Sequence, residues 1–474
     1  MYQSFIGLEI HIQLLTKSKV FCSCKANFGD EPNTNVCPVC LGYPGVLPNL
    51  NEQAIKMGYI VARALNCKLA DSAVFARKNY FYPDMPKNYQ ISQFEDPIGR
   101  DGYIDIEISG ETKRVRIHEV HLEEDAGKMI HAGDVSLCDY NRAGTPLLEI
   151  VTEPDMCTGA EAEALIHELR KMVRYLGVCD GNMEEGSLRC DANVSINKKG
   201  QGLGTKVEIK NLNSSRFVRL GLDYEIERQT ALMDEGKPII QETRLWNENR
   251  DVTEPMRTKE SAHDYRYFPE PDLPPFRPDK SFLEDVEKAQ VELPLAKKQR
   301  FIKSYGLTEQ QADYLCEEIA RADFFETAVK KGAEPQVAAS WLAGDVARQL
   351  NRQKMELTDS PLSLERFVSL MSLLKTGEIH GKIAKQVLIA IFEENKDPLT
   401  IIEEKGWKQL SKDELYAHIN AVIQENSTAA DQVKAGDDKP LGFLMGKLMA
   451  RTSGRAHPEE ARKTLIDIIR GGTE

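Results

Sequence analysis

The sequence has no long hydrophobic run and no excess of positive charge. No stretch approaches the roughly 20 apolar residues that a membrane-spanning helix needs. Residues 1–9 contain no basic segment ahead of an apolar one, so a secretory signal peptide is not indicated. The formal net charge of −13 argues against a general polyanion binder, because Lys and Arg supply non-specific affinity for nucleic acids, but it is compatible with a local basic patch. We therefore expect a soluble, cytoplasmic protein with no membrane partner.

Common nucleotide-binding and nucleophile motifs are also missing. There is no Gly-x-x-x-x-Gly-Lys-[Ser/Thr] sequence, which excludes a P-loop. The Gly-rich residues 200–204 lack the spacing and context of a dinucleotide fingerprint, and they predict a hairpin turn. Residues 177–181 resemble a nucleophile elbow, but a predicted helix precedes them and a strand follows, which is the reverse of an elbow. Cys179 is therefore expected to be an inert residue at a helix end.

The ten cysteines do not suggest a disulfide framework. Six are scattered singly, which suits a reducing compartment. The other four form two close pairs in the loop 22–40, which is rich in Asn, Pro and Gly. Four thiolates in such a loop can coordinate zinc tetrahedrally, which predicts a structural zinc site. The Cys-x-Cys spacing of the first pair is shorter than the usual ligand spacing. Free structural thiols are the alternative. The predicted zinc ligands are Cys22, Cys24, Cys37 and Cys40.

The first part of the chain, residues 1–292, mixes short strand-like runs with long helices. A helix is predicted from 159 to 176, because apolar residues recur there at spacings of three and four, with Gly177 as its stop. The pattern predicts a mixed α/β body. The strand-like runs cover residues 5–14, 102–108, 113–123, 147–152, 192–196 and 206–209.

The rest of the chain predicts helices only. A Pro-rich segment at 268–278 ends the mixed pattern, and residues 293–406 then have helical periodicity, as in 308–321 and 334–350. A turn-rich break at 395–398 precedes a last helical part, residues 407–474. We therefore expect an α+β protein with a mixed body, an all-α domain and a small all-α tail.

Two stretches of the body place charged and amide side chains beside short apolar runs. They are Asp139–Glu149 (Asp-Tyr-Asn-Arg-Ala-Gly-Thr-Pro-Leu-Leu-Glu) and Met183–Ser195 (Met-Glu-Glu-Gly-Ser-Leu-Arg-Cys-Asp-Ala-Asn-Val-Ser). Burying a charge is costly unless it meets a partner or a cation, so both stretches indicate a polar site set into a sheet. Glu9 and His11 lie two residues apart in a strand-like run, so their side chains share a face.

A series of motifs resembles the B subunits of the bacterial and organellar aspartyl/glutamyl-tRNA amidotransferases (GatB). The series runs in family order along essentially the whole chain, which makes it far more specific than any single short motif. Besides the two polar stretches it comprises Ile6–His11, Tyr43–Pro48, Arg77–Gln93, Leu122–Lys128, Lys206–Ser214, Asp264–Asp272 and Gly442–Lys447.

The resemblance implies a role in a heterotrimeric ligase that forms carbon–nitrogen bonds with glutamine as amido-nitrogen donor. The partners would be an amidase (GatA), which releases ammonia, and a small third protein (GatC). The GatB component would use ATP to phosphorylate the side-chain carboxylate of Glu mischarged on tRNA(Gln) or Asp mischarged on tRNA(Asn), and ammonia would displace the phosphate. The synthetase that mischarges the tRNA is a further candidate partner. The implied fold is a glutamine-synthetase-like cradle, a helical domain and a YqeY-like tail.

Such chemistry needs positive charge around the transferring phosphoryl group more than it needs a base, because a carboxylate is already ionised at neutral pH. The resemblance implies that His11, Glu124 and Glu149 hold Mg²⁺, with Glu9 as a further catalytic residue. A His ligand is unusual for magnesium, so Mn²⁺ is an alternative metal for this site. From the residues alone, a buried His with a carboxylate partner is the alternative.

Further residues are candidates for binding ATP and substrate. Lys206 and Lys210 would share one face of a strand, Asp191 and Asn193 would support the metal, and Asn211 would hold a polar group or cap a turn. For each cation an ordinary solvated surface position is the alternative. The candidates are Lys78, Lys87, Arg142, Asp191, Asn193, Lys206, Lys210, Asn211, Arg257 and Lys259.

The tail carries a basic pattern in an otherwise acidic chain. Lys447, Arg451 and Arg455 recur every four residues, so on a continuous helix they would form a stripe able to follow a phosphate backbone. A solvated helix face is the alternative. Because the resemblance places a tRNA-contacting module here, we expect these three residues to bind tRNA, with recognition by shape.

Three other functions compete with the activating component. A zinc-stabilised, non-catalytic tRNA-binding scaffold would need no polyvalent cation site in its sheet. A free-standing ligase for small acids would leave the basic tail unexplained. The archaeal paralogue specific for Glu-tRNA is expected to carry an extra inserted domain, for which the path from the Pro-rich segment to the tail leaves no obvious room.

Overall fold

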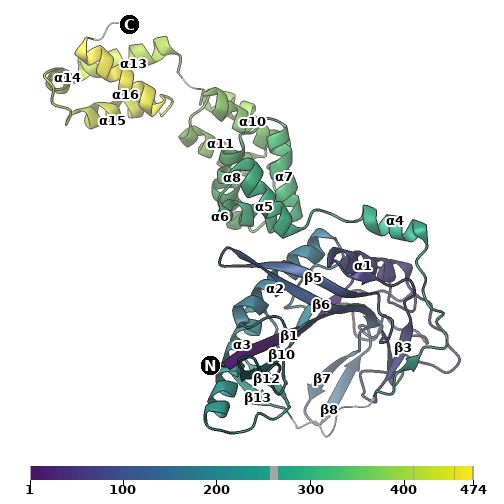
Figure 1. The fold of residues 1–474 in the computed structure, drawn as a ribbon. Helices are drawn as coiled ribbons and strands as arrows, with labels where there is room; N and C mark the ends of the chain where they lie inside the picture. The colour runs from purple at the N-terminus through teal and green to yellow at the C-terminus, as the bar shows by residue number, and fades with distance from the viewer. Residues whose placement is uncertain (1, 257–264, 409, 453, 472–474) are drawn as a thin grey trace. The chain divides into compact units, whose positions relative to one another are not determined.

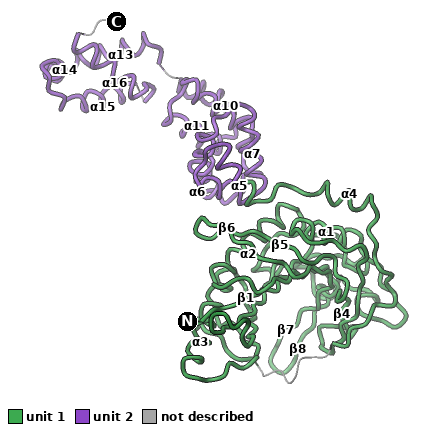
Figure 2. Tube along the Cα trace, viewed as in Figure 1, with its two compact units in different colours: residues 1–297 green, residues 298–474 purple. Residues whose placement is uncertain are grey.

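The computed structural model describes residues 2–256, 265–408, 410–452 and 454–471. The chain forms two compact units, residues 1–297 and 298–474 (Figure 2). The first boundary lies five residues after the predicted end of the body at 292. The further division of the helical part at 406 and 407 stays a prediction, although the second unit contains two separate hydrophobic cores, one between Phe301 and Ile402 and one between Leu410 and Ile469.

A nine-stranded sheet forms the centre of the first unit (Figure 1). Neighbouring strands pair antiparallel except β11 and β12, which are parallel. All six strand-like runs predicted from the sequence lie in this sheet. Across the sheet the order is β13 (Val252–Pro255), β12 (Thr243–Asn247), β11 (Val207–Lys210), β10 (Leu188–Lys198), β1 (Tyr2–Gln13), β9 (Pro146–Thr152), β6 (Glu111–Glu124), β5 (Gly99–Ile108) and β2 (Lys68–Leu69).

One face of the sheet is buried under three helices. Even-numbered residues of β1, from Ile6 to Ile12, are at most 1% exposed and share a core with apolar residues of the helices. Burying one such side chain stabilises the fold by about 1.5–3 kcal/mol. Since successive strand residues point to opposite faces, Glu9 and His11 must lie on the other face. The helices are α1 (Glu52–Ala64), α2 (Gly159–Tyr175) and α3 (Ser215–Asp234).

Local capping explains where these helices begin. The side chains of Asn51, Thr158 and Ser214 each accept a hydrogen bond from a backbone N–H in the first turn that follows. The predicted helix over 159–176 is confirmed, and Gly177 after it has a positive φ of 65°. The hairpin turn predicted at 200–204 is confirmed by the antiparallel pairing of β10 and β11.

Strand β6 contains an irregularity that sets which side chains face the core. Between Ile117 and Glu119 the pairing with β9 shifts, so β6 has one extra residue there. Before the shift the core residues are odd-numbered, as Val115 and Ile117. After it they are even-numbered, as Val120 and Leu122. The bulge therefore determines the orientation of every later side chain in β6.

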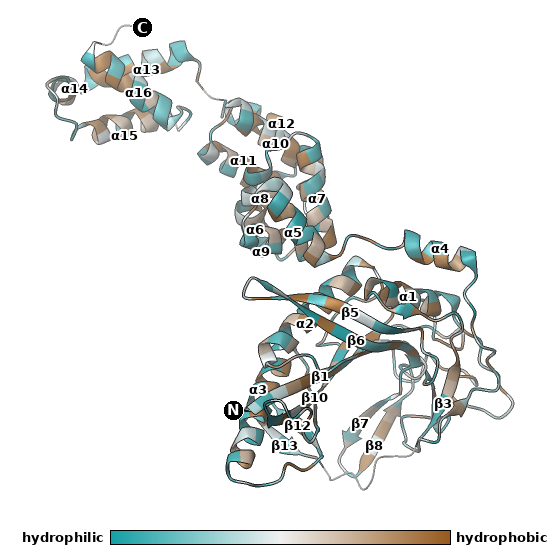
Figure 3. Cartoon of the chain, viewed as in Figure 1, coloured by the Kyte–Doolittle hydropathy of each residue, from teal (hydrophilic) through white to brown (hydrophobic). Residues whose placement is uncertain are grey.

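Two small sheets and one helix complete the first unit. A three-stranded sheet joins β3 (Phe75–Asn79), β4 (Tyr89–Gln93) and β14 (Phe268–Pro269), and the β4 side chain of Gln93 accepts a hydrogen bond from the backbone of Leu122 in β6. The hairpin β7–β8 (Lys128–Ala132 and Val135–Asp139) has a largely hydrophobic β8 (Figure 3). Helix α4 (Lys280–Lys288) contacts α1 through an ion pair between Lys56 and Asp285.

The rest of the described chain is helical, as predicted, but two expected helices are interrupted. The run 308–321 divides at Glu317 and Glu318, and the run 334–350 passes through a π-helical turn, Leu342–Val346. No described helix is long and apolar enough to span a membrane. The helices are α5 (Pro294–Tyr305), α6 (Glu309–Cys316), α7 (Ile319–Lys330), α8 (Pro335–Trp341), α9 (Ala347–Gln353), α10 (Leu364–Thr376), α11 (Gly381–Glu394), α12 (Pro398–Lys405), α13 (Lys412–Glu425), α14 (Ser427–Lys434), α15 (Leu441–Arg451) and α16 (Pro458–Arg470).

Candidate active site

A row of ionisable side chains crosses four adjacent strands on the face opposite the helices. His11 of β1 lies opposite Arg189 of β10 and Glu149 of β9, and Glu149 in turn lies opposite His121 of β6. Side chains at paired positions of neighbouring strands share a face and lie close together. The register alone therefore brings four residues that are distant in sequence into one row.

Carboxylates bridge the two histidines of this row. His11 Nε2 lies 3.4 Å from Glu149 Oε2 and 3.5 Å from Glu123 Oε1. His121 Nε2 lies 2.9 Å from Glu149 Oε2. One ligand atom from each of His11, Glu123 and Glu149 lies within 4.8 Å of the others, which is close enough for all three to hold one metal ion.

The electrostatics of this cluster also favour a cation. Burial by itself lowers the pKa of His11, but hydrogen bonding to Glu149 and the charges of Glu149 and Glu123 outweigh it and raise that pKa to about 9. The pKa of His121 is raised in the same way, against its burial, chiefly by Glu149. Although burial opposes it, the two imidazoles lower the pKa of Glu149 well below its usual range. Glu149 therefore stays ionised and attracts positive charge.

The cluster lines an open cavity of about 500 Å³. Burial, followed by the nearby charge of Glu149, raises the pKa of Glu9, which accepts a hydrogen bond from Asn193 Nδ2 at 2.9 Å. The buried Oδ1 of Asn193 has no hydrogen-bond partner in the described part of the chain. Carboxylates outnumber cationic side chains in the cavity, so the donor set fits divalent metal ions. The carboxylates are Glu9, Glu123, Asp125, Glu149, Asp191 and Glu208, and the cations are Lys78, Arg189 and Lys210.

The structure corrects the expected metal ligand Glu124. Glu123 occupies the place beside His11 and Glu149, and Glu124 points to the opposite face of β6 because adjacent strand residues alternate. There Glu124 Oε1 accepts a hydrogen bond from the backbone N–H of Ile91 at 2.8 Å and forms an ion pair with Lys87. Glu124 therefore does not belong to the cluster around His11.

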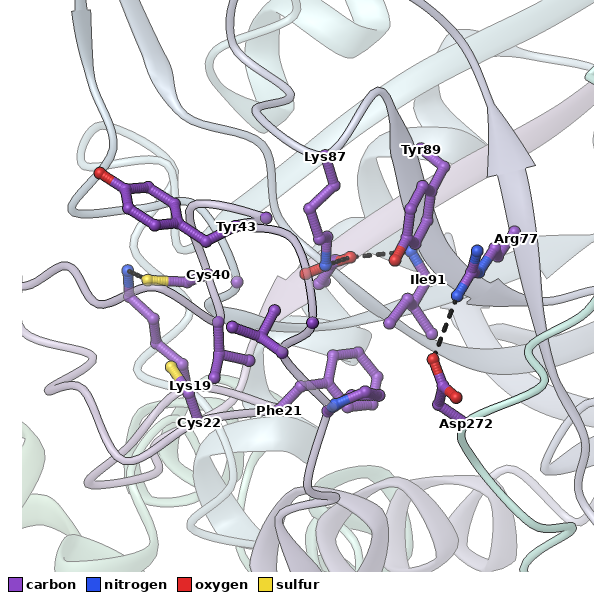
Figure 4. A pocket seen from close by; sticks show the side chains of 17 residues that line it. Lys19, Phe21, Cys22, Cys40, Tyr43, Arg77, Lys87, Tyr89, Ile91 and Asp272 are labelled. Atoms are coloured by element: carbon purple, nitrogen blue, oxygen red, sulfur yellow. Dashed lines mark hydrogen bonds and ion pairs between the residues drawn. The ribbon is translucent and has the colours of Figure 1, made fainter.

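Lys87 and Glu124 line a second, smaller cavity (Figure 4). It lies between the loop that contains Cys22 and Cys40 and the strands β3 and β4. Figure 4 shows Lys87 beside Tyr89, with Arg77 paired to Asp272. Lys87 was predicted to bind ATP or substrate, and it does not line the cavity that contains His11.

Replacement of Lys87 by Met is expected to destabilise the chain by about 3 kcal/mol, because it leaves the buried Glu124 carboxylate without its cation. Urea unfolding of the purified chain measures this. The double variant Lys87→Met/Glu124→Gln should recover much of the loss, since both charges are then removed. Equal stability of the Lys87→Met variant and wild type would contradict the importance of the pair.

Three other predicted substrate-binding residues line the larger cavity. The ammonium of Lys78 lies 4.9 Å from the centre of the Tyr265 ring. Lys210 Nζ lies 2.7 Å from Asp191 Oδ2, and although burial opposes it, the charge of Asp191 raises the pKa of Lys210. Lys78, Asp191 and Lys210 are thus brought together around the His11 cluster, with Asn193 beside Glu9.

Three further predicted substrate-binding residues, Arg142, Lys206 and Asn211, do not line this cavity. Arg142 donates to the carbonyls of Ala126 and Gly127 and lines a separate cavity. Lys206 is exposed and directly precedes β11; its positive charge acts on Glu9, so it lies near the cavity without lining it. Asn211 has a φ of 66° and donates to the Trp246 carbonyl at 2.9 Å, which is the turn-stabilising alternative. Arg257 and Lys259 lie outside the described residues.

The four predicted zinc ligands meet in one cluster. The thiol sulfurs of Cys22, Cys24, Cys37 and Cys40 all lie within 4.8 Å of one another, so the residues can hold a metal ion. The backbone N–H of Cys37 donates to Cys40 Sγ at 3.2 Å, and the buried Lys19 ammonium lies 3.6 Å from the same sulfur. A hydrogen bond to Cys22 contributes most to lowering the pKa of Cys40, which falls to about 4. The Cys37 backbone N–H and the Lys19 ammonium lower it further, and both donors suit a thiolate.

The remaining cysteine prediction is consistent with the structure. Cys179 is buried directly after α2, and burial raises the pKa of its thiol to about 12. A thiol with so high a pKa is a poor nucleophile at neutral pH. The elbow-like residues 177–181 therefore form the end of a helix and no catalytic turn.

Sequence reasoning missed His121, which contacts Glu149, and several residues that line the cavity, among them Glu123, Glu208, Asp125 and Arg189. A signal for the first two was present, because Glu119, His121 and Glu123 alternate in the predicted strand 113–123 as Glu9 and His11 do in theirs. Glu208 lies opposite Asn193 in the pairing of β10 with β11, and this contact requires the strand pairing to be known.

The basic stripe expected in the tail is only partly formed. Helix α15 contains Lys447 and ends at Arg451, so Arg455 does not lie on the same helix. Lys447 and Arg451 are exposed, and Arg451 forms an ion pair with Glu425 of α13 at 2.7 Å. The condition of one continuous helix is therefore not met, although two of the cations are one turn apart, and tRNA binding by the three residues stays a prediction.

Comparison with known proteins agrees with this architecture. A family model described as the GatB/GatE catalytic domain matches residues 4–284, and one described as the GatB domain matches residues 323–469. The chain is 48% identical over 475 residues to the aspartyl/glutamyl-tRNA(Asn/Gln) amidotransferase B subunit of Carboxydothermus hydrogenoformans, covering 99% of each chain. It is 48% identical over 472 residues to the corresponding protein of Persephonella marina, covering 99% of this chain and all of the relative. The chain therefore belongs to the family of aspartyl/glutamyl-tRNA(Asn/Gln) amidotransferase B subunits.

Proposed function

We propose that the chain is the activating component of a heterotrimeric amidotransferase, together with an amidase (GatA) and a small third protein (GatC). It uses ATP to phosphorylate the side-chain carboxylate of Glu-tRNA(Gln), Asp-tRNA(Asn) or both. Ammonia from the amidase then displaces the phosphate and gives the amide. The observation that carries this proposal is the cluster of His11, Glu123 and Glu149 in an acidic cavity of about 500 Å³.

The chain's own residues fit the needs of this reaction. Mg²⁺ or Mn²⁺ bound by His11, Glu123 and Glu149 would supply charge neutralisation at the phosphoryl group. Lys78 and Lys210 add positive charge at the cavity wall, and the ion pairs of Lys210 with Asp191 and Glu208 hold its ammonium in place. Positioning and charge neutralisation of this kind provide most of the catalysis in phosphoryl transfer.

The four cysteines have a separate role in this proposal. Zinc at Cys22, Cys24, Cys37 and Cys40 would have all its positions filled by thiolates, so it would stabilise the loop and take no part in the reaction. His11 and the other residues of the acidic cavity contain no thiol, which suits hard cations such as magnesium.

The reconstituted complex tests the proposal through ATP cleavage. Phosphate release should require Mg²⁺, a glutamine donor and Glu-tRNA(Gln) together, with one phosphate released for each amide formed. Uncharged tRNA(Gln) is the matched control, because it lacks only the carboxylate that is to be activated. Equal phosphate release with charged and uncharged tRNA would contradict activation of that carboxylate, and amide formation without any ATP cleavage would leave the chain as a zinc-stabilised scaffold.

The exposed cations of α15 are proposed to contact the tRNA. Lys447→Glu and Arg451→Glu should each weaken tRNA binding, and a charge-neutral change at either position should reduce the salt dependence of log Kd by about one unit of slope. Filter binding at several salt concentrations measures this. Lys382, which is also exposed and lies on α11, provides a matched control through Lys382→Glu. Equal salt slopes for the Lys447→Gln variant and wild type would place the contact elsewhere.

A further inference from the structure

One cation of the acidic cavity has no role in the activation proposed above. Lys78 and Lys210 are the cations assigned to the phosphoryl group, and Arg189 of β10 lines the same cavity. Arg189 lies opposite His11 in the pairing of β10 with β1, so the two side chains leave neighbouring positions on one face of the sheet. The guanidinium of Arg189 is therefore a positive charge at the site whose partner in the reaction is unassigned.

Asp125 holds this guanidinium in place. Arg189 Nη2 donates to Asp125 Oδ2 at 3.0 Å, and the side chain of Asp125 is only 5% exposed. Asp125 also accepts a hydrogen bond from Gln13 Nε2 at 3.1 Å and lies 3.5 Å from Arg142 Nε. Because three side chains hold the carboxylate, the guanidinium that it anchors needs little reorganisation to bind a ligand.

Most N–H groups of the Arg189 guanidinium have no acceptor in the described part of the chain. A guanidinium has five N–H donors, and Asp125 is the one hydrogen-bond partner that Arg189 has among these residues. Its Nε is buried and has no partner there. A buried donor without an acceptor is costly, so its position at the wall of a cavity indicates that a ligand supplies the acceptor.

The chemistry of these free donors fits a carboxylate. A guanidinium offers parallel N–H groups at the spacing of the two carboxylate oxygens, and the resulting pair is charge-assisted and bidentate. A lysine acts as a point charge, which suits the phosphates assigned to Lys78 and Lys210. The carboxylates of the cavity repel any further anion, so a substrate carboxylate can stay only beside a cation with donors to spare.

We propose that Arg189 binds the side-chain carboxylate of the amino acid on the tRNA, the group that is to be phosphorylated. Arg189 thereby distinguishes the acid from the amide product, because an amide is neutral and places an NH2 group where one carboxylate oxygen was. Each carboxylate oxygen has two lone pairs, so it can accept from Arg189 and still attack phosphorus. This inference rests on the proposed function, in which that carboxylate reacts with ATP beside His11.

The test compares two ligands that differ only in the group that Arg189 recognises. They are tRNA(Gln) carrying Glu or Gln on a 3′-amino-3′-deoxyadenosine, whose amide linkage resists hydrolysis. Equilibrium binding to the reconstituted complex is measured without ATP or glutamine. Wild type should bind the Glu form about 10- to 100-fold more tightly than the Gln form, the effect of one charge-assisted pair. Arg189→Met should bind the two forms equally.

Two further variants separate recognition from structure. Arg189→Lys keeps a positive charge beside Asp125 but loses the planar fork, so its preference should lie between those of wild type and Arg189→Met. Gln13→Met is the matched control, because it also removes a hydrogen bond to Asp125 but lies at a different cavity, and it should keep the wild-type preference. If Arg189→Met did not assemble, an unchanged preference in Arg189→Lys would still overturn the proposal.

Phosphate release tests the competing assignment of Arg189 to ATP. In this assay Arg189→Met should raise the KM for Glu-tRNA(Gln) about 10- to 100-fold and leave the KM for ATP unchanged. A raised KM for ATP with an unchanged preference for the Glu form would assign Arg189 to the phosphates of ATP and overturn the proposal. A wild-type preference that persists in Arg189→Met would also overturn it.

The two proposals fail in different ways. If wild type preferred the Glu form, Arg189→Met lost this preference and wild type released no phosphate, the proposed activation would fail and the role of Arg189 would stand. Phosphate release that depends on Glu-tRNA(Gln), with equal binding of the Glu and Gln forms by wild type, would overturn the role of Arg189 and leave the activation in place.

Discussion

His11→Ala is expected to lower tRNA-dependent phosphate release by the reconstituted complex about a thousandfold or more, because the cluster with Glu123 and Glu149 loses its only nitrogen ligand. Glutamine hydrolysis by the amidase should persist, which shows that the complex has assembled. His118→Ala is the matched control, since His118 lies on β6 of the same sheet and, like His11, pairs with a carboxylate, Glu153, at 2.9 Å, but is exposed. Full activity of the His11→Ala variant would exclude this cluster as the site of activation.

The same assay distinguishes the two adjacent carboxylates of β6. Glu123→Gln should reduce phosphate release about as strongly as Glu149→Gln, since both residues lie beside His11. Glu124→Gln should leave metal binding at the His11 cluster intact, because Glu124 faces Lys87 on the other side of the strand. Retained metal affinity in Glu123→Gln, with loss in Glu124→Gln, would contradict this arrangement.

Loss of the four-cysteine site is expected to have the largest effect on stability. Cys22→Ser/Cys40→Ser should abolish bound zinc, which we expect at about one ion per chain, and lower the melting temperature of the first unit by about 10 °C. The physical reason is that the loop 22–40 has little regular secondary structure, so a metal ion held by the four cysteines would provide much of its stability. Metal analysis and thermal unfolding with and without a chelator measure both effects.

Cys138→Ser is the matched control for the zinc variants, because Cys138 is also partly buried but lies outside the cluster. It should retain zinc and unfold within about 2 °C of wild type, as expected for a substitution away from a special site. A metal-free wild-type chain that unfolds at the same temperature as the zinc-loaded one would show that the thiols are structural without metal.

Much of the fold could be predicted because it depends on local periodicity. The strand of β1 alternates buried Ile residues with Glu9 and His11, and α2 has its cap, its apolar spacing and its terminal Gly in the sequence. For the site, the alternation in the first strand placed Glu9 and His11 on one face, whereas the metal-binding role of His11 and Glu149 was expected from the family resemblance. His11 and Glu149 were identified, together with the polar neighbours Asp191 and Lys210.

The errors within the sheet have a common physical origin in strand register. Glu123 and Glu124 are adjacent in sequence, and only the pairing of β6 with β9 shows which of them faces the site. Glu208 and the exact partners of His11 likewise depend on which strands pair, and this is long-range information. In the tail, the spacing of Lys447, Arg451 and Arg455 is helical, but the helix ends at Arg451, before the last of them.

The bulge in β6 has a consequence for how this chain can change length during evolution. One extra residue between Ile117 and Glu119 turns His121 and Glu123 towards His11 and turns Leu122 into the core. A single-residue insertion between Val120 and His121 would exchange the two faces of the strand beyond it and place the carboxylates of the site in a hydrophobic interior. The tip of the β5–β6 hairpin, Ser109–Gly110, lies before the bulge and in solvent, so insertions should accumulate there and be absent from residues 118–124.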